Sequence, residues 1–267
     1  MIESWIPIIL KAGLDASARI LEIYQSDFGV QYKADESPVT QADLEADRII
    51  REALTPTGVP VITEESFAQF KTDKPSSMYW VVDPIDGTRD FVNRTNEFTV
   101  NIALVIQGKP VLGLLIAPAL STFPGGAWLG WTDHGLWHWP MDHIWELKEA
   151  YMQQPSLPAK RGMLASRSDF RDSGKAMQKH FGAKAQEGPT QRVGSSLKFA
   201  WIAAGLAEWY PRAQHLSAWD LAAGHALVLA AGGKVEEWEP GVPLRYNLPK
   251  VEMPPFVAYA PKIETHK

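Results

Sequence analysis

Two short apolar runs in the first third of the chain each end in carboxylates. The run 59–63 is followed by Glu64 and Glu65, and the run 78–82 is followed by Asp83. Apolar runs of this length, rich in β-branched and aromatic residues, are typical of buried strands. We expect the ends of these two strands to reach the same edge of one sheet. The pattern therefore predicts a sheet-based core with an acidic site at its edge.

Helical and strand patterns alternate along the rest of the chain. Apolar residues recur at helical spacing over 5–28, and Thr40 with Asp43 forms a capping-box pattern that begins a second helix, which ends near Leu54. We therefore expect a mixed α/β fold, without internal repeats. The further strands are predicted at 98–106 and 111–117 (as a hairpin), in the tryptophan-rich stretch 128–139, and at 162–166 and 207–210. The further helices are predicted at 169–181, 195–204 and 220–231.

The segment 154–160 contains two prolines and is the best candidate for a linker. It predicts two α/β halves that share an interface. The N-terminal half, 1–153, contains most of the candidate carboxylates, and the C-terminal half, 154–267, contains the last of them.

Composition excludes several classes of protein. Of the 267 residues, 45% are hydrophobic and 21% are charged, as in a soluble globular protein with a substantial core. With 26 basic and 31 acidic residues, the chain lacks the basic excess of a protein that coats nucleic acid. Cysteine is absent, which excludes disulfides, thiolate nucleophiles and zinc–sulfur sites. No apolar run reaches about 18 residues, so we expect no integral membrane segment and a cytoplasmic location.

The sequence Asp-Pro-Ile-Asp-Gly-Thr at 83–88 is the most informative motif. Its proline stiffens the turn after a buried strand, so Asp83 and Asp86 can converge with the carbonyl group of Ile85 between them. Two carboxylates and a carbonyl form the all-oxygen set that Mg²⁺ prefers. Gly87 and Thr88 then offer N–H groups to a phosphate at a predicted helix start. Taken alone, the motif is also compatible with a capped turn.

A further carboxylate, Asp220, begins the last predicted helix. A single aspartate in that position is usually a helix cap. However, four carboxylate positions lie at element ends, and the acidic excess is concentrated between residues 33 and 97. This combination favours a polynuclear metal site over a solvated acidic face. A non-catalytic Mg²⁺-binding protein is the rival interpretation from a different functional class.

Three motifs resemble the signatures of the inositol monophosphatase superfamily, the lithium-sensitive, Mg²⁺-dependent phosphatases. They are ITEES at 62–66, WVVDPIDGT at 80–88, and WDLAAG at 219–224 with the glycine pair that follows Ala231. The resemblance extends from the first helix to about Trp238. It implies a five-layer α-β-α-β-α sandwich.

Three further segments resemble the CysQ-type 3′(2′),5′-bisphosphate nucleotidases within that superfamily. They are RDF at 89–91, EFTVNIAL at 97–104, and GSSLKF at 194–199 followed by YPR at 210–212. The resemblance implies hydrolysis of the 3′-phosphate of adenosine 3′,5′-bisphosphate, a by-product of sulfate assimilation, to AMP and phosphate. 3′-Phosphoadenylyl sulfate is a further candidate substrate. The metal motifs are common to the superfamily, so inositol monophosphate or another small phosphomonoester is the alternative.

The resemblance also implies roles for individual residues, beginning with two or three Mg²⁺ ions. Glu64, Asp83 and the Ile85 carbonyl would bind the first ion, and Asp83, Asp86 and Asp220 the second. The catalytic pair would be Thr88 and Asp43, which orient the attacking water, although the capping box alone also explains Asp43. The implied substrate-binding residues are Glu64, Ile85, Asp86, Gly87, Thr88, Ser168, Gly194, Lys198 and Asp220.

The second phosphate of a nucleotide bisphosphate requires a cation of the protein. Lys198 is the first candidate because it lies in the first turn of a predicted helix, and Arg89 and Arg212 are open alternatives. A histidine commonly follows Ser168 in the family, whereas Asp169 stands here, so that part of the nucleotide contact is open. The sequence leaves open the oligomeric state, and also peripheral attachment to the cytoplasmic face of the inner membrane.

Overall fold

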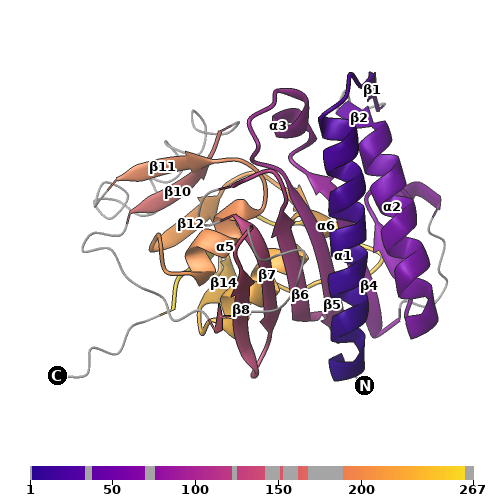
Figure 1. Cartoon of the computed structure of the whole chain (residues 1–267). Helices are drawn as coiled ribbons and strands as arrows, with labels where there is room; N and C mark the ends of the chain where they lie inside the picture. The colour runs from indigo at the N-terminus through magenta and orange to yellow at the C-terminus, as the bar shows by residue number, and fades with distance from the viewer. Residues whose placement is uncertain are drawn as a thin grey trace.

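Helices α1 (Ile2–Tyr24) and α2 (Gln41–Leu54) form an outer layer of the structure (Figure 1). The computed structural model describes residues 2–33, 38–69, 76–121, 125–141, 151–152, 162–167 and 189–261. The predicted capping box is present, since Thr40 caps α2 and the side chain of Asp43 bonds back to it. The two helices pack together against one face of a large sheet.

The described strands of this sheet are ordered β3-β4-β5-β6-β7-β8-β9. Strands β3 and β4 are parallel, and every other neighbouring pair is antiparallel. Because helices cover both faces, the central strands are buried almost continuously rather than alternately. Their bounds are β3 Val61–Thr63, β4 Met78–Asp86, β5 Thr99–Ile106, β6 Lys109–Ala117, β7 Gly126–Trp131, β8 Gly135–Trp139 and β9 Tyr151–Met152.

The alternation of side chains along β4 divides the core in two. Trp80 and Val82 pack with the α1–α2 layer, whereas Tyr79 and Val81 belong to the core on the opposite face. That second core contains helices α5 (Leu197–Ala203) and α6 (Ala218–Ala230), which form the inner helical layer.

Helix α6 lies unusually close to the large sheet. A Cβ atom at Gly113 of β6 would lie 2.3 Å from the carbonyl oxygen of Ala223, and one at Gly130 of β7 would lie 2.7 Å from the Cα atom of Leu227. These two glycines therefore let the helix backbone rest directly on the sheet. Buried on most sides, α6 is apolar almost all round, as expected for a central helix.

A second sheet, ordered β11-β10-β12-β16-β14, covers the inner helices from the other side (Figure 1). Its parallel pairs are β10–β11 and β10–β12, and its antiparallel pairs are β12–β16 and β14–β16. Its strands are β10 Met163–Ser166, β11 Thr190–Val193, β12 Trp209–Arg212, β14 Lys234–Glu237 and β16 Phe256–Tyr259. The small elements are β1 Val30–Tyr32 with β2 Pro38–Thr40, β13 Leu216–Ser217 with β15 Glu252–Met253, η1 Thr55–Thr57, η2 Phe67–Gln69 and α3 Thr88–Val92.

Four layers of the expected five-layer sandwich are therefore present in the described residues. The predicted helix at 169–181, the predicted linker at 154–160 and the boundary between the predicted halves lie outside them. No helix in the described part of the chain is long and apolar enough to cross a membrane.

Several element bounds differ from the predicted ones for identifiable reasons. Strand β4 continues to Asp86 because its pairing with β5 resumes after an irregularity between Asp83 and Asp86. The hairpin turn is only Gln107-Gly108, both with positive φ, so β6 begins two residues earlier than predicted. Helix α6 is capped by Ser217, which makes Asp220 its third residue rather than its first.

Candidate metal centre and substrate pocket

A cavity of about 610 Å³ lies between the end of β4 and the segment that precedes α5. Most of the predicted site residues reach it. Asp43, Asp83 and Ile85 lie behind its surface, and Ser168 lies outside the described residues. The predicted residues that line the cavity are Glu64, Asp86, Gly87, Thr88, Gly194, Lys198 and Asp220.

Three carboxylates converge at one end of this cavity. One oxygen from each of Asp83, Asp86 and Asp220 lies within 4.8 Å of the other two. The irregularity in β4 brings Asp83 and Asp86 to the same place. Asp220 is held by the capping box, in which its Oδ2 accepts a 2.7 Å hydrogen bond from the backbone N–H of Ser217.

The electrostatics of this cluster favour a cation. Burial and the neighbouring carboxylates raise the pKa values of Asp83 and Asp220 well above their usual range. Asp83 is only 1% exposed, and within the described residues neither of its carboxylate oxygens receives a hydrogen bond. Buried carboxylates with unused lone pairs are typical metal ligands, and oxygen donors suit a hard divalent ion. The donor set therefore fits the metal that the sequence predicts.

Glu64 joins the same site from the neighbouring strand. It follows β3, where its backbone N–H donates to the carbonyl of Val82 at 3.2 Å and so keeps it beside β4. The ammonium group of Lys33 lies 2.7 Å from Glu64 and 2.7 Å from Glu65. Burial raises the pKa of Glu64, and the charge of Lys33 opposes that rise. Sequence reasoning did not identify Lys33.

Thr88 and Asp43 meet as the resemblance implies. The Thr88 hydroxyl lies 3.2 Å from Asp43 Oδ1 and 3.1 Å from the carbonyl oxygen of Ile85. The other oxygen of Asp43, Oδ2, accepts from the backbone N–H and the hydroxyl of Thr40. One carboxylate therefore caps α2 with one oxygen and contacts Thr88 with the other. The capping box and a catalytic role for Asp43 do not exclude each other.

Ser196 connects Asp86, at the end of β4, with the backbone of Asp220 in α6. Its hydroxyl contacts Asp86 Oδ2 and lies 2.6 Å from the backbone carbonyl oxygen of Asp220, while the amide of Asn101 donates to it at 3.0 Å. Ser196 was not predicted as a site residue. The only signal in the sequence is its place in the GSSLKF segment.

Cationic side chains lie on the remaining wall of the cavity. Lys198 is buried, and its ammonium group donates to the carbonyls of Val193 and Ser195 at 3.0 and 2.5 Å. Burial lowers the pKa of Lys198 to about 8, although the carboxylate of Asp86 opposes that change. The other cations that line the cavity are Arg89, Arg167 and Arg212.

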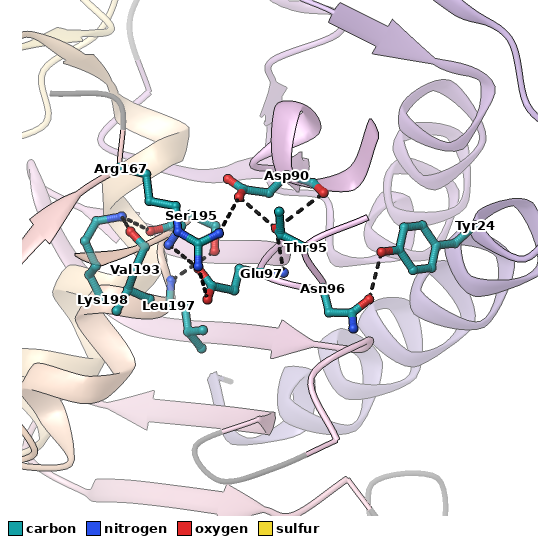
Figure 2. A network of polar contacts seen from close by, with 11 residues as sticks. Tyr24, Asp90, Thr95, Asn96, Glu97, Arg167, Val193, Ser195, Leu197 and Lys198 are labelled. Carbon is teal, nitrogen blue, oxygen red and sulfur yellow. Dashed lines mark hydrogen bonds and ion pairs between the residues drawn. The ribbon is translucent and has the colours of Figure 1, made fainter. Parts of the chain in front are cut away.

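A second polar network lies at the edge of the cavity (Figure 2). The guanidinium group of Arg167 is 2.6 Å from Glu97 and 3.4 Å from Asp90, and Glu97 also accepts from the backbone N–H of Gly194. Gly194, predicted to bind substrate, thus uses its N–H within the protein. Glu97 was not predicted as a site residue, whereas Arg167 lies in the stretch 166–168, which resembles a nucleotide-contacting segment of the family.

The comparisons with known proteins identify the family of this chain. The sequence model of the inositol monophosphatase family matches residues 1–265. The 3′(2′),5′-bisphosphate nucleotidase CysQ of Salmonella typhimurium is 37% identical over 234 residues, which cover 84% of this chain and 87% of that protein. The protein of the same name from Escherichia coli is 37% identical over 238 residues, covering 87% and 90%.

The solved structures extend the agreement to the fold. The crystal structure of CysQ from Bacteroides thetaiotaomicron superimposes with a TM-score of 0.80 at 31% identity, covering 96% of this chain and 97% of that one. The inositol monophosphatase from Anabaena shares the fold, with a TM-score of 0.68 at 22% identity and coverage of 97% and 92%. The chain is therefore a member of the inositol monophosphatase family, in its CysQ-type branch.

Proposed function

We propose that this chain is a Mg²⁺-dependent phosphoric monoester hydrolase that converts adenosine 3′,5′-bisphosphate to AMP and phosphate. The observation that carries the proposal is a single cavity with a carboxylate cluster at one end and two buried cations, Lys198 and Arg212, on its wall. The acidic end suits metal ions over a reacting phosphate, and the basic wall suits a second phosphate. The relatives named CysQ carry the name 3′(2′),5′-bisphosphate nucleotidase.

The metal ions of this proposal would be held by protein oxygens. Members of this family are generally metal-dependent, and we infer two or three Mg²⁺ ions here. When bound, they would neutralise the phosphate oxygens and lower the pKa of the attacking water. The residues that would hold them are Glu64, Asp83, Asp86, Asp220 and the Ile85 carbonyl.

Thr88 and Asp43 would orient the water and take up its proton. The Thr88 hydroxyl can donate to Asp43 Oδ1, which leaves its own oxygen as an acceptor for a proton of the water. The raised pKa of Asp43, caused mainly by burial, favours uptake of that proton by its carboxylate. Water would attack the phosphorus and the bond between phosphorus and the 3′ oxygen would break. The leaving oxygen would take a proton from solvent, and Asp43 would later return the proton of the attacking water to solvent.

Lys198 and Arg212 would hold the 5′-phosphate. Both side chains are largely buried, with exposed fractions of 4% and 8%, and both line the cavity. Charged hydrogen bonds to a phosphate are strong in such a desolvated place. A substrate with a single phosphate would not form these contacts, which is a physical basis for preferring a bisphosphate.

The test is phosphate release from adenosine 3′,5′-bisphosphate and from inositol 1-phosphate, each with Mg²⁺ alone and with Mg²⁺ plus Li⁺. We expect preference for the nucleotide, inhibition by Li⁺, and loss of activity in Asp86→Asn. The matched control is Asp15→Asn, the same change at an exposed aspartate that forms an ion pair with Lys11. Preference for inositol 1-phosphate would retain the metal site and refute the nucleotide substrate. Activity in the presence of a chelator would refute the metal mechanism.

A further inference from the structure

The segment that connects α3 to β5 is held in a strained conformation by side chains of α1 and of the loop after it. Arg94 and Asn96 both have positive φ, at 58° and 67°, a region that residues other than glycine seldom adopt. The Arg94 guanidinium lies over the rings of Tyr24 and Phe28. Figure 2 shows the Tyr24 hydroxyl, which donates to the side-chain oxygen of Asn96 at 2.7 Å. These contacts fix the position of the next residue, Glu97.

The carboxylate of Glu97 bridges two segments of the opposite sheet layer. Its Oε1 lies 2.6 Å from the guanidinium of Arg167, which follows β10, and its Oε2 accepts from the N–H of Gly194, which follows β11, also at 2.6 Å. Figure 2 shows the Arg167 side chain pointing toward Glu97 and Asp90. Asp90 is held in turn by the Thr95 hydroxyl at 2.8 Å.

Both partners of Glu97 belong to the wall of the substrate cavity. Gly194 is followed by Ser195, which has a positive φ of 46° and whose carbonyl accepts from Lys198. Gly194 also lies close to Asp90, because a Cβ atom at position 194 would be 2.8 Å from the Asp90 carboxylate. The contacts of Glu97 therefore determine the distance between the carboxylate cluster and the cavity wall that contains Lys198.

The charges of this network also affect the electrostatic potential at the cavity edge, where an anionic substrate would enter. Asp90 and Glu97 are two carboxylates at the edge of a cavity that would receive a phosphate, and Arg167 is the cation that contacts both of them. The Arg167 side chain is 42% exposed, so it needs these contacts to keep one orientation. Among the described residues, loss of Glu97 would leave Arg167 with its longer contact to Asp90.

We propose that Glu97 is a positioning residue that determines specificity for the second phosphate. It does so by fixing Arg167 and the Gly194–Ser195 backbone, and hence Lys198, at one distance from the reacting phosphate. This inference rests on the proposed nucleotidase function and adds to it a residue that does not itself touch the metals or the scissile bond.

The test compares adenosine 3′,5′-bisphosphate with adenosine 3′-monophosphate, which differ only in the second phosphate. Glu97→Gln keeps an oxygen for the Gly194 N–H but removes the charge that holds Arg167. We expect the ratio of kcat/KM for the two substrates to fall about tenfold, equal to about 1.4 kcal/mol, mainly through a higher KM for the bisphosphate. Glu97→Asp, which keeps the charge on a shorter side chain, should restore part of the ratio.

Two further variants separate this role from a general structural one. Arg167→Gln leaves the Gly194 contact intact and should lower the same ratio, and the double variant should lower it by less than the product of the single effects. If Glu97→Gln does not fold, Arg167→Gln carries the same expectation. The control is Glu45→Gln, which removes an ion pair with Arg19 elsewhere on the protein.

The possible outcomes are distinct. A wild-type protein that does not hydrolyse the bisphosphate would refute the proposed function, and this inference with it. A wild-type protein that prefers the bisphosphate, together with an unchanged ratio in both Glu97→Gln and Arg167→Gln, would refute the role of Glu97 alone. Equal losses of kcat on both substrates would also refute it, because they would indicate disturbance of the metal cluster.

Discussion

Asp83→Asn should stabilise the metal-free protein and yet nearly abolish its activity. Asp83 is buried among Glu64, Asp86 and Asp220, with both oxygens unpartnered within the described residues. A buried polar group left unsatisfied destabilises a protein by about 1–3 kcal/mol. The asparagine amide removes the charge and can donate to a neighbouring carboxylate. We therefore expect the free energy of unfolding in the presence of a chelator to rise by about 1–3 kcal/mol.

Mg²⁺ should cancel most of that difference in stability or reverse it. A protein of this size shifts its melting temperature by about 2–4 °C per kcal/mol, so the variant should melt roughly 2–12 °C higher than wild type in a chelator. At Mg²⁺ concentrations about 100 times its Kd, the wild type should gain about 2.7 kcal/mol from ligand binding. The variant should gain little. Loss of several kcal/mol of transition-state stabilisation corresponds to a fall in kcat/KM of roughly 100-fold or more.

The assay is thermal unfolding with and without Mg²⁺, with Asp15→Asn as the matched surface control. The advantage of the variant should shrink as pH falls. The raised pKa of Asp83 means that the folded wild type binds a proton above the ordinary Asp value of about 3.9, so lowering the pH toward that value removes the buried charge. A variant that melts below wild type in chelator, or that keeps the full Mg²⁺ shift, would contradict the reasoning.

Three other substitutions test separate parts of the site. Thr88→Val should lower kcat about 100-fold or more with little change in melting temperature, because it removes the hydroxyl that passes a proton toward Asp43; an unchanged kcat would refute this role. Lys198→Met should raise KM for the bisphosphate at pH 7. We expect the KM of the wild type to rise above pH about 8, where the lowered pKa of Lys198 removes its charge, and the variant to lack that rise. Ser196→Ala should weaken Mg²⁺ binding about 10–100-fold, measured by titration, because its hydroxyl orients a carboxylate ligand.

Local patterns were sufficient to predict most of the acidic site. The apolar run before Asp83 predicts strand β4, which places Asp83 at the site. The Thr40–Asp43 spacing predicts the capping box of α2. The parallel pairing of β3 with β4 brings Glu64 to the same edge, as the order of apolar runs and carboxylates indicated. The sequence prediction begins α6 at Asp220, whereas Ser217 caps the helix and Asp220 is its third residue.

The contacts across the two sheet layers were beyond prediction from one sequence. Ser196 meets Asp86, and Glu97 meets Gly194, only because segments about a hundred residues apart in the chain approach each other in the fold. No local periodicity encodes such pairs. Strands β11 and β14 were also missed, since TQRV and KVEE show neither an apolar run nor a clear alternation.

Helix α6 packs very closely on the large sheet, and this packing affects the metal preference of the proposed site. Gly113 and Gly130 determine the depth of the helix, and the helix determines where Asp220 stands relative to Asp83. A methyl group at either glycine would lift the helix and widen the carboxylate cluster. For the Mg²⁺ ions proposed above, the ionic radius that the cluster selects would therefore depend on two residues outside the ligand set, so a change of metal preference during evolution would require no change of ligand.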